Sequence, residues 1–174
     1  MDYENEGCLH EIFDRQMKRT NPTATAVVSD DGRSISFSEL DYLTDILGTN
    51  LRHKGVERNS AVGMYLEKSL EYPIAYTAIL RAGGAYMPLE LSYPENLLYS
   101  ILEDAKPAAV ITTENLKEKI PSSVTVIVLN EGWADRLAKE NEAGPVLEEV
   151  KSTLDDLAYI VYSSGTTGKP KGKV

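Results

Sequence analysis

The chain has 174 residues, a length suited to one domain, and 42% of them are hydrophobic, enough to build a core. Its 27 acidic residues outnumber the 18 basic ones, giving a net charge of −9, and no basic cluster precedes the C-terminal loop; this argues against a nucleic-acid-binding protein. No apolar run approaches the ~18 residues that span a bilayer. Cys8 is the only cysteine, and residues 1–6 are acidic rather than signal-like, so we expect a cytoplasmic protein without a membrane partner.

The first predicted elements are a hairpin and a helix. Residues 26–29 and 34–37 are strand candidates, and the Asp-Asp-Gly turn at 30–32 separates them. Ser36 and Glu39 have the spacing of a capping box, which predicts a helix immediately afterwards. Four leucines follow at helical spacing and would form its apolar face: Leu40, Leu43, Leu47 and Leu51.

Three more apolar segments predict strands at 61–67, 108–113 and 124–129. Helices are expected between and after them. The first is capped by Ser69 and ends at Gly83, where a pair of glycines interrupts the pattern.

A second such helix opens after Tyr93 and Pro94, a brief one lies between the last two of these strands, and a more polar one covers about 132–141. The charged segment 141–152 is expected to be a surface loop. Strands that alternate with helices are typical of βαβ units. The predicted fold class is therefore α/β, with a mainly parallel sheet and flanking helices.

The last predicted strand, an apolar run at 157–162 that looks buried, leads into the most informative segment. Residues 162–172 read Tyr-Ser-Ser-Gly-Thr-Thr-Gly-Lys-Pro-Lys-Gly. Glycines let a backbone approach a ligand closely, and successive N–H groups can form an anion-binding concavity. The hydroxyls and lysines add donors and positive charge, so the composition suits a polyphosphate, although a polar loop that binds nothing has the same composition. Its glycine spacing is not that of a Walker A sequence.

Three blocks of this sequence resemble those of a known family. Residues 157–172 resemble the phosphate-loop signature of the adenylate-forming (AMP-binding, ANL superfamily) enzymes. Residues 80–90, followed by Tyr93-Pro94, look like the second conserved block of amino-acid adenylation domains, and residues 35–41 look like the first. The resemblance extends over about 9–172 and is to the N-terminal part of the large subdomain of a nonribosomal peptide synthetase-type adenylation domain.

The resemblance implies an ATP-dependent ligase. Such an enzyme uses ATP and Mg²⁺ to convert a carboxylic or amino acid into an acyl- or aminoacyl-adenylate, with release of pyrophosphate, and passes the acyl group to the phosphopantetheine thiol of a carrier protein. The implied partners are ATP, the acid, the rest of the adenylation domain and the carrier protein. The residues that the resemblance assigns to the phosphates are Ser163, Ser164, Gly165, Thr166, Thr167, Gly168 and Lys171.

In the family the acid pocket, the magnesium ligand, the catalytic lysine and the small C-terminal subdomain come after the phosphate loop. We therefore expect residues 1–174 to be an N-terminal fragment, without catalytic or metal-binding residues and inactive alone. Two alternatives stay open. One is a non-catalytic truncated product that binds nucleotide weakly or contacts a partner, including its own copies through exposed apolar surface. The other is the acyl-CoA synthetase branch of the superfamily.

Two pairs of carboxylates also need an interpretation. Glu103 and Asp104 are adjacent on a predicted helix and do not face each other, so we expect no paired acid–base role. Asp155 and Asp156 precede the last predicted strand, and we expect a solvated turn rather than a contact with magnesium.

Overall fold

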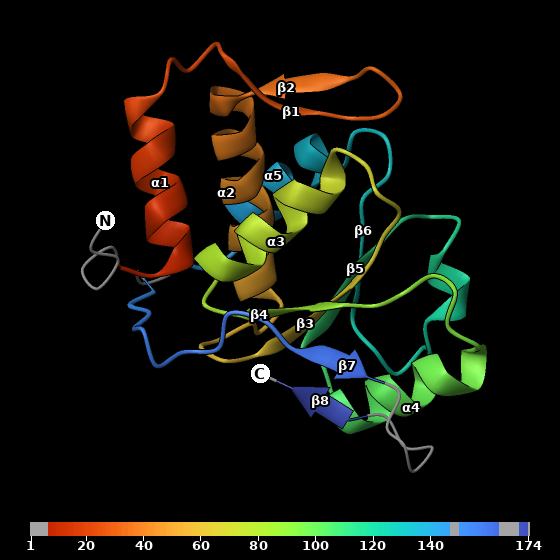
Figure 1. Ribbon diagram of the computed structural model, residues 1–174. Helices are drawn as coiled ribbons and strands as arrows, with labels where there is room; N and C mark the ends of the chain where they lie inside the picture. The colour runs from red at the N-terminus through yellow and green to blue at the C-terminus, as the bar shows by residue number, and fades with distance from the viewer. Residues whose placement is uncertain (1–6, 147–149, 164–170, 174) are drawn as a thin grey trace.

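The computed structural model describes residues 7–146, 150–163 and 171–173, and of Ser163, Lys171 and Lys173 only the backbone. Four parallel strands form the central sheet in the order β4-β3-β5-β6 (Figure 1). Their bounds are Ala61–Tyr65 (β3), Ala85–Pro88 (β4), Ala109–Thr112 (β5) and Val126–Val128 (β6). Two antiparallel pairs accompany the sheet: β1 (Thr25–Val28) with β2 (Ser34–Ser36), and β7 (Val161–Ser163) with β8 (Lys171–Lys173).

Helices cover both faces of the parallel sheet, as the sequence predicts. The helices are α1 (Leu9–Arg19), α2 (Phe37–His53), α3 (Glu71–Arg81), α4 (Glu95–Ala105) and α5 (Trp133–Glu142), with a short 3-10 helix, η2 (Lys117–Lys119). In Figure 1, α2, α3 and α5 lie above the sheet and α4 lies below it. Among the described residues no helix is long and apolar enough to cross a membrane.

The parallel sheet divides the core into two halves, because successive side chains of a strand point to opposite faces of the sheet. Val62 and Met64 of β3 pack with α2, α3 and α5, whereas Tyr65 packs with α4. Likewise Ile111 of β5 belongs to the first half and Val110 to the second. Burial on both faces is the usual condition of a parallel sheet, and it explains why these strands read as nearly continuous apolar runs.

The start of α2 forms as predicted. The Ser36 hydroxyl accepts a hydrogen bond from the Glu39 backbone N–H (3.3 Å), and the Glu39 carboxylate accepts one from the Ser36 N–H (2.8 Å). The capping box is thereby confirmed. Leu47 and Leu51 are fully buried, and Leu40 and Leu43 pack against the same core, so the predicted apolar face is also correct.

Two predictions about local structure are wrong, and one strand was missed. The helix after β3 is preceded by Leu70, and no side chain caps it, so Ser69 is not its cap. Strand β4 at Ala85–Pro88 was not predicted at all. Of the run 157–162, expected to be a buried strand, the structure makes a strand only from Val161 onward, and Tyr159 and Val161 are 47% and 45% exposed.

Leu47→Ala in the 174-residue chain is expected to lower the free energy of unfolding by about 2–5 kcal/mol, because truncation of a fully buried leucine loses apolar contacts and leaves a cavity. Urea unfolding followed by circular dichroism measures this. The matched control is Tyr42→Ala on the same helix, where the side chain is 58% exposed and the change should stay within about 0.5 kcal/mol. Equal losses in the two variants would contradict the assigned core.

Candidate phosphate-binding site

The two ends of the predicted phosphate loop lie side by side. Strands β7 and β8 pair in antiparallel fashion, and their register places Ser163 directly opposite Lys171 and Tyr162 opposite Gly172. Two of the seven predicted site residues, Ser163 and Lys171, are thus neighbours in the backbone. The other five, Ser164, Gly165, Thr166, Thr167 and Gly168, lie outside the described residues. The structure therefore positions the base of the loop.

The segment before the loop extends the parallel sheet at its β4 edge. The Tyr86 N–H donates to the carbonyl of Ala158 (3.1 Å), and the Ile160 N–H donates to the carbonyl of Tyr86 (3.0 Å), which makes a parallel bridge between Tyr86 and Tyr159. The rings of these two tyrosines also pack, with centroids 6.0 Å apart.

This bridge fixes the end of the sheet at which the base of the loop lies. The segment runs parallel to β4, and Ser163 follows Tyr159 by four positions, whereas β4 ends at Pro88, two positions after Tyr86. The loop therefore starts beyond the carboxyl end of β4. That is the edge at which open α/β sheets bind their ligands.

Tyr162 anchors the loop base to the underside of the sheet. Its side chain joins the core beside α4, and its hydroxyl donates a 2.6 Å hydrogen bond to the Asp104 carboxylate. Burial, and then the Asp104 carboxylate, raise the pKa of Tyr162 from 10.0 to about 12. On β8, Gly172 lies against the same ring: a Cβ there would be 3.2 Å from Cζ of Tyr162, a tight contact that the ring would have to relieve by a small shift.

A cluster of polar side chains holds the chain just before this segment. Arg58, in the turn between α2 and β3, donates to both carboxylate oxygens of Asp156, at 3.0 Å from Nε and 2.6 Å from Nη2. The Thr153 N–H donates to the same carboxylate (2.7 Å). The Asp156 side chain is only 9% exposed, and the hydrogen bonds from Arg58 lower the pKa of Asp156 to about 2. The expectation of a solvated turn is correct for the exposed Asp155 and wrong for Asp156.

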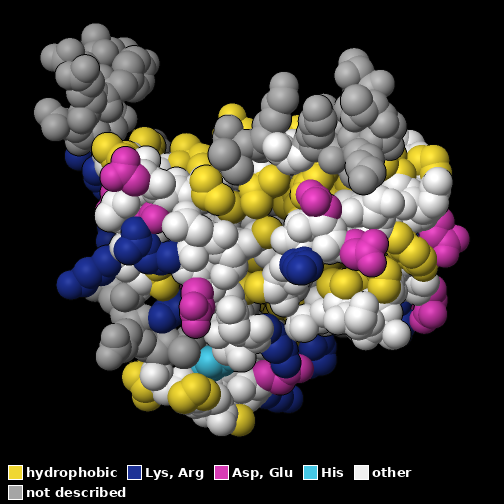
Figure 2. All heavy atoms as spheres, turned by 90° about the horizontal axis from the view of Figure 1, so that it is seen from below, with side chains coloured by type: hydrophobic (Ala, Val, Ile, Leu, Met, Phe, Trp, Pro, Cys, Tyr) yellow, Lys and Arg dark blue, Asp and Glu magenta, His cyan; other side chains and the backbone are white. Residues whose placement is uncertain are grey.

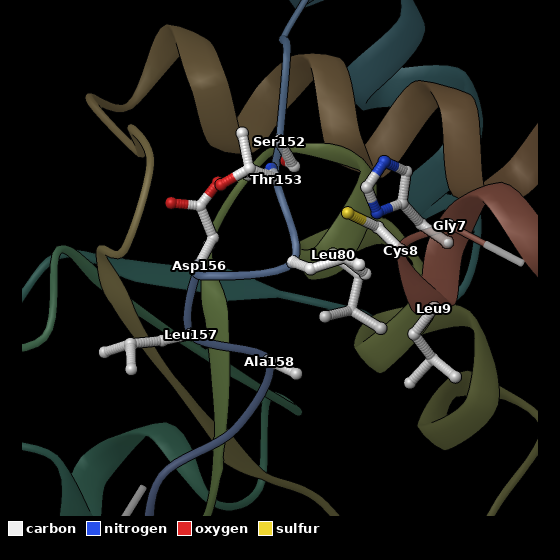
Figure 3. Close-up of a pocket in the computed structure, with 13 residues that line it drawn as sticks. Gly7, Cys8, Leu9, Leu80, Ser152, Thr153, Asp156, Leu157 and Ala158 are labelled. Atoms are coloured by element: carbon white, nitrogen blue, oxygen red, sulfur yellow. The ribbon is translucent and has the colours of Figure 1, made fainter. Parts of the chain in front are cut away.

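Asp156 also borders a cavity of about 180 Å³ between the start of α1 and the 152–158 segment (Figure 3). Cys8 and Leu80 line it from the other sides. Burial, followed by the charge of Glu11, raises the pKa of the Cys8 thiol, which keeps it protonated and makes it a poor nucleophile. Within the described ranges no group of three or more His, Cys, Asp or Glu side chains could hold a metal ion.

On the lower side of Figure 1, where α4 and β8 lie, hydrophobic side chains reach the surface among acidic and basic ones (Figure 2). The exposed Tyr159 and Val161 are two positions apart, so they share one face of the segment that leads to the loop.

Sequence reasoning missed the anchors of the loop base. Tyr162 is 58 positions from Asp104, and Arg58 is 98 positions from Asp156. Asp104 was assigned no role, and Arg58 was not singled out. No local pattern marks such pairs, because helix caps and strand periodicity report only on neighbours within a few residues.

The raised pKa of Tyr162 predicts a pH dependence of stability. Because folding favours the protonated phenol, the stabilisation is present below pH 10 and is lost as the pH rises through about 12. Tyr162→Phe has no phenol to ionise and should lack this loss, which unfolding measurements between pH 10 and about 12 would show. Asp104→Asn leaves Tyr162 buried and removes the neighbouring charge, so the pH at which this stabilisation is lost should fall part of the way toward 10. A wild-type profile in Tyr162→Phe would contradict the assignment.

Comparisons with known proteins identify the family of the chain. The family of AMP-binding enzymes matches residues 13–174. The chain is 46% identical to glycine betaine reductase ATRR of Emericella nidulans over 94% of its own length, and 39% identical to tyrocidine synthase 2 of Brevibacillus parabrevis over 98%. It covers 13% and 4% of these two relatives, and between 2% and 15% of the curated relatives compared.

Solved structures show the same fold. The nonribosomal peptide synthetase FmoA3 with α-methyl-L-serine-AMP bound superposes with a TM-score of 0.77 at 32% identity, over 95% of this chain and 18% of that one. VinN in complex with 3-methylaspartate superposes with a TM-score of 0.80 at 25% identity, over 96% of this chain and 47% of that one. With its parallel sheet, its loop base and a family match over almost its whole length, the chain belongs to the AMP-binding enzymes and is similar to the N-terminal part of a nonribosomal peptide synthetase adenylation domain.

Proposed function

We propose that this chain forms the phosphate-binding part of an adenylation domain that activates a carboxylic acid with ATP and Mg²⁺. In that reaction a carboxylate oxygen attacks the α-phosphorus of ATP, and pyrophosphate leaves. The acyl group then passes to the phosphopantetheine thiol of a carrier protein. The observation that carries the proposal is the β7–β8 pair, whose loop starts beyond the carboxyl end of the sheet in a member of the AMP-binding family.

The residues of the loop suit the leaving β- and γ-phosphates. Hydroxyls of Ser164, Thr166 and Thr167 would donate hydrogen bonds, while Gly165 and Gly168 would open backbone N–H groups to the ligand. Lys171, which belongs to the pattern of the family, would supply the positive charge. One lysine–phosphate pair at ~4 Å is worth roughly 4 kcal/mol before desolvation at an effective dielectric near 20, so local charge can offset the net charge of −9.

The proposal assigns no residue of this chain to the magnesium ion. The described part of the chain brings no three carboxylates, histidines or cysteines together, and the proposal names no magnesium ligand. When bound, magnesium would neutralise charge on the phosphates. The contribution proposed for this chain is the positioning of the leaving group.

The names and bound ligands of three relatives suggest the class of acid. ATRR is named for glycine betaine, FmoA3 holds α-methyl-L-serine-AMP, and VinN binds 3-methylaspartate. All three are amino acids or close derivatives. We therefore place the substrate of the complete domain among amino acids and their N- or C-methylated derivatives, with the acyl-CoA synthetase branch as the second candidate.

Lys171→Ala in the longer protein that carries this segment should lower the rate of ATP–pyrophosphate exchange by about 10²–10³-fold, the range for loss of one preorganised donor to a developing charge. Lys169→Ala is the matched control, since it removes the same charge two positions away at a site that the family pattern leaves variable. Circular dichroism checks that both variants fold. Exchange at the wild-type rate in Lys171→Ala would contradict the role of this lysine.

The 174-residue chain alone should show no acid-dependent exchange with magnesium, ATP and a pool of amino and other carboxylic acids. The reason is its extent: it covers 42% of the N-terminal subdomain of Klebsiella oxytoca NpsA, a related fold. Light scattering on the same sample tests whether the exposed face of Tyr159 and Val161 promotes self-association. Exchange by the isolated chain would show that it assembles a working site. Absence of exchange in the longer protein would favour the non-catalytic alternative.

A further inference from the structure

We infer that Asp156, held by Arg58 and Asn59, is a positioning residue that sets the register of the strand leading into the phosphate loop. The inference rests on the proposed function, since it concerns how the loop meets the phosphates. The role of these three residues is to fix where the chain enters β7.

The contacts of this cluster converge on two adjacent residues of the chain. Asn59 donates from Nδ2 to the Asp156 carboxylate (3.2 Å) and accepts at Oδ1 from the Leu157 N–H (2.6 Å). Arg58 donates two hydrogen bonds to the same carboxylate. Side chain and backbone are thus held at consecutive positions, which fixes the orientation of the chain as well as its location.

The other half of the cluster is itself attached to the sheet. Asn59 has a left-handed backbone (φ 64°), and its N–H donates to the carbonyl of Gly83, in the turn that precedes β4 (3.0 Å). The start of β4 is joined to the start of β3 as well, because the Ala85 N–H donates to the carbonyl of Ser60 (2.8 Å). The cluster therefore fixes the position of residues 156–157 relative to the first residues of β3 and β4.

Backbone pairing alone specifies this register weakly. Strand β7 has three residues, and the segment touches β4 through a single bridge. A slip of one residue would turn every side chain to the opposite face. Tyr162 would then leave the core beside α4, and Ser163 would no longer enter the loop at its present position. The anchors at Asp156 and Leu157 lie only two and one positions before Ala158, the first residue to bond to β4, and so prevent that slip.

The test is ATP–pyrophosphate exchange by the longer protein, with KM measured for ATP and for the acid separately. Asp156→Asn keeps the size and removes the charge that Arg58 binds, and it should raise the KM for ATP about ten-fold or more, because a displaced positioning element is costly in rate and binding. The KM for the acid should not change. Asn59→Gly removes the side-chain hydrogen bonds and tolerates the left-handed backbone, so it should have the same effect. The double variant should be no worse than either single one.

Asp155→Asn is the matched control, because it makes the same charge change at an exposed position with no ion pair among the described residues. A purely structural role would lower the fraction of folded enzyme, and hence kcat, with both KM values unchanged. That result overturns the inference, as do equal rises in both KM values or a match between Asp156→Asn and Asp155→Asn. A wild-type protein without exchange would overturn the proposed function and the inference together.

Discussion

The hydrogen bonds between β4 and the segment after Ala158 are the interaction on which the rest of the site depends. A parallel sheet ends at β4, and an unpaired edge there would leave backbone N–H and C=O groups without partners. Tyr86 pairs with this segment instead, and the parallel direction of the bridge sends the chain toward the carboxyl edge of the sheet. That single bridge therefore determines where the base of the loop and its partner strand β8 lie.

So short a pairing is specific only because side chains from distant parts of the chain support it. Before the bridge, Asp156 is held by Arg58 and Asn59; after it, Tyr162 is buried beside α4 and bound to Asp104. One anchor is ionic and close to the surface, and the other combines burial with a hydrogen bond. Together they fix the strand on both sides of its contact with β4.

Local signals predicted much of the fold. The capping box at Ser36 and the leucine spacing of α2 act within a few residues, so they could be recognised without the structure. Strand β4 was missed because Ala85–Pro88 contains no β-branched residue and ends in proline, which is unusual in a strand interior. The run 157–162 is apolar on both faces and was therefore predicted to be a buried strand. It lies instead beside β4 at the edge of the sheet, where Tyr162 is the only residue of the run that is buried.

The sequence by itself determined the composition of the loop, because the glycines, hydroxyls and lysines at 162–172 are groups from which an anion-binding concavity can be built, and phosphate binding there stays a prediction. It also determined the α/β class through the alternation of its elements. Only the tertiary structure decided where the base of the loop lies and what holds it. The reason is that its anchors pair residues 58 and 98 positions apart, and such pairs form only after the sheet has brought β4, α4 and the turn before β3 together.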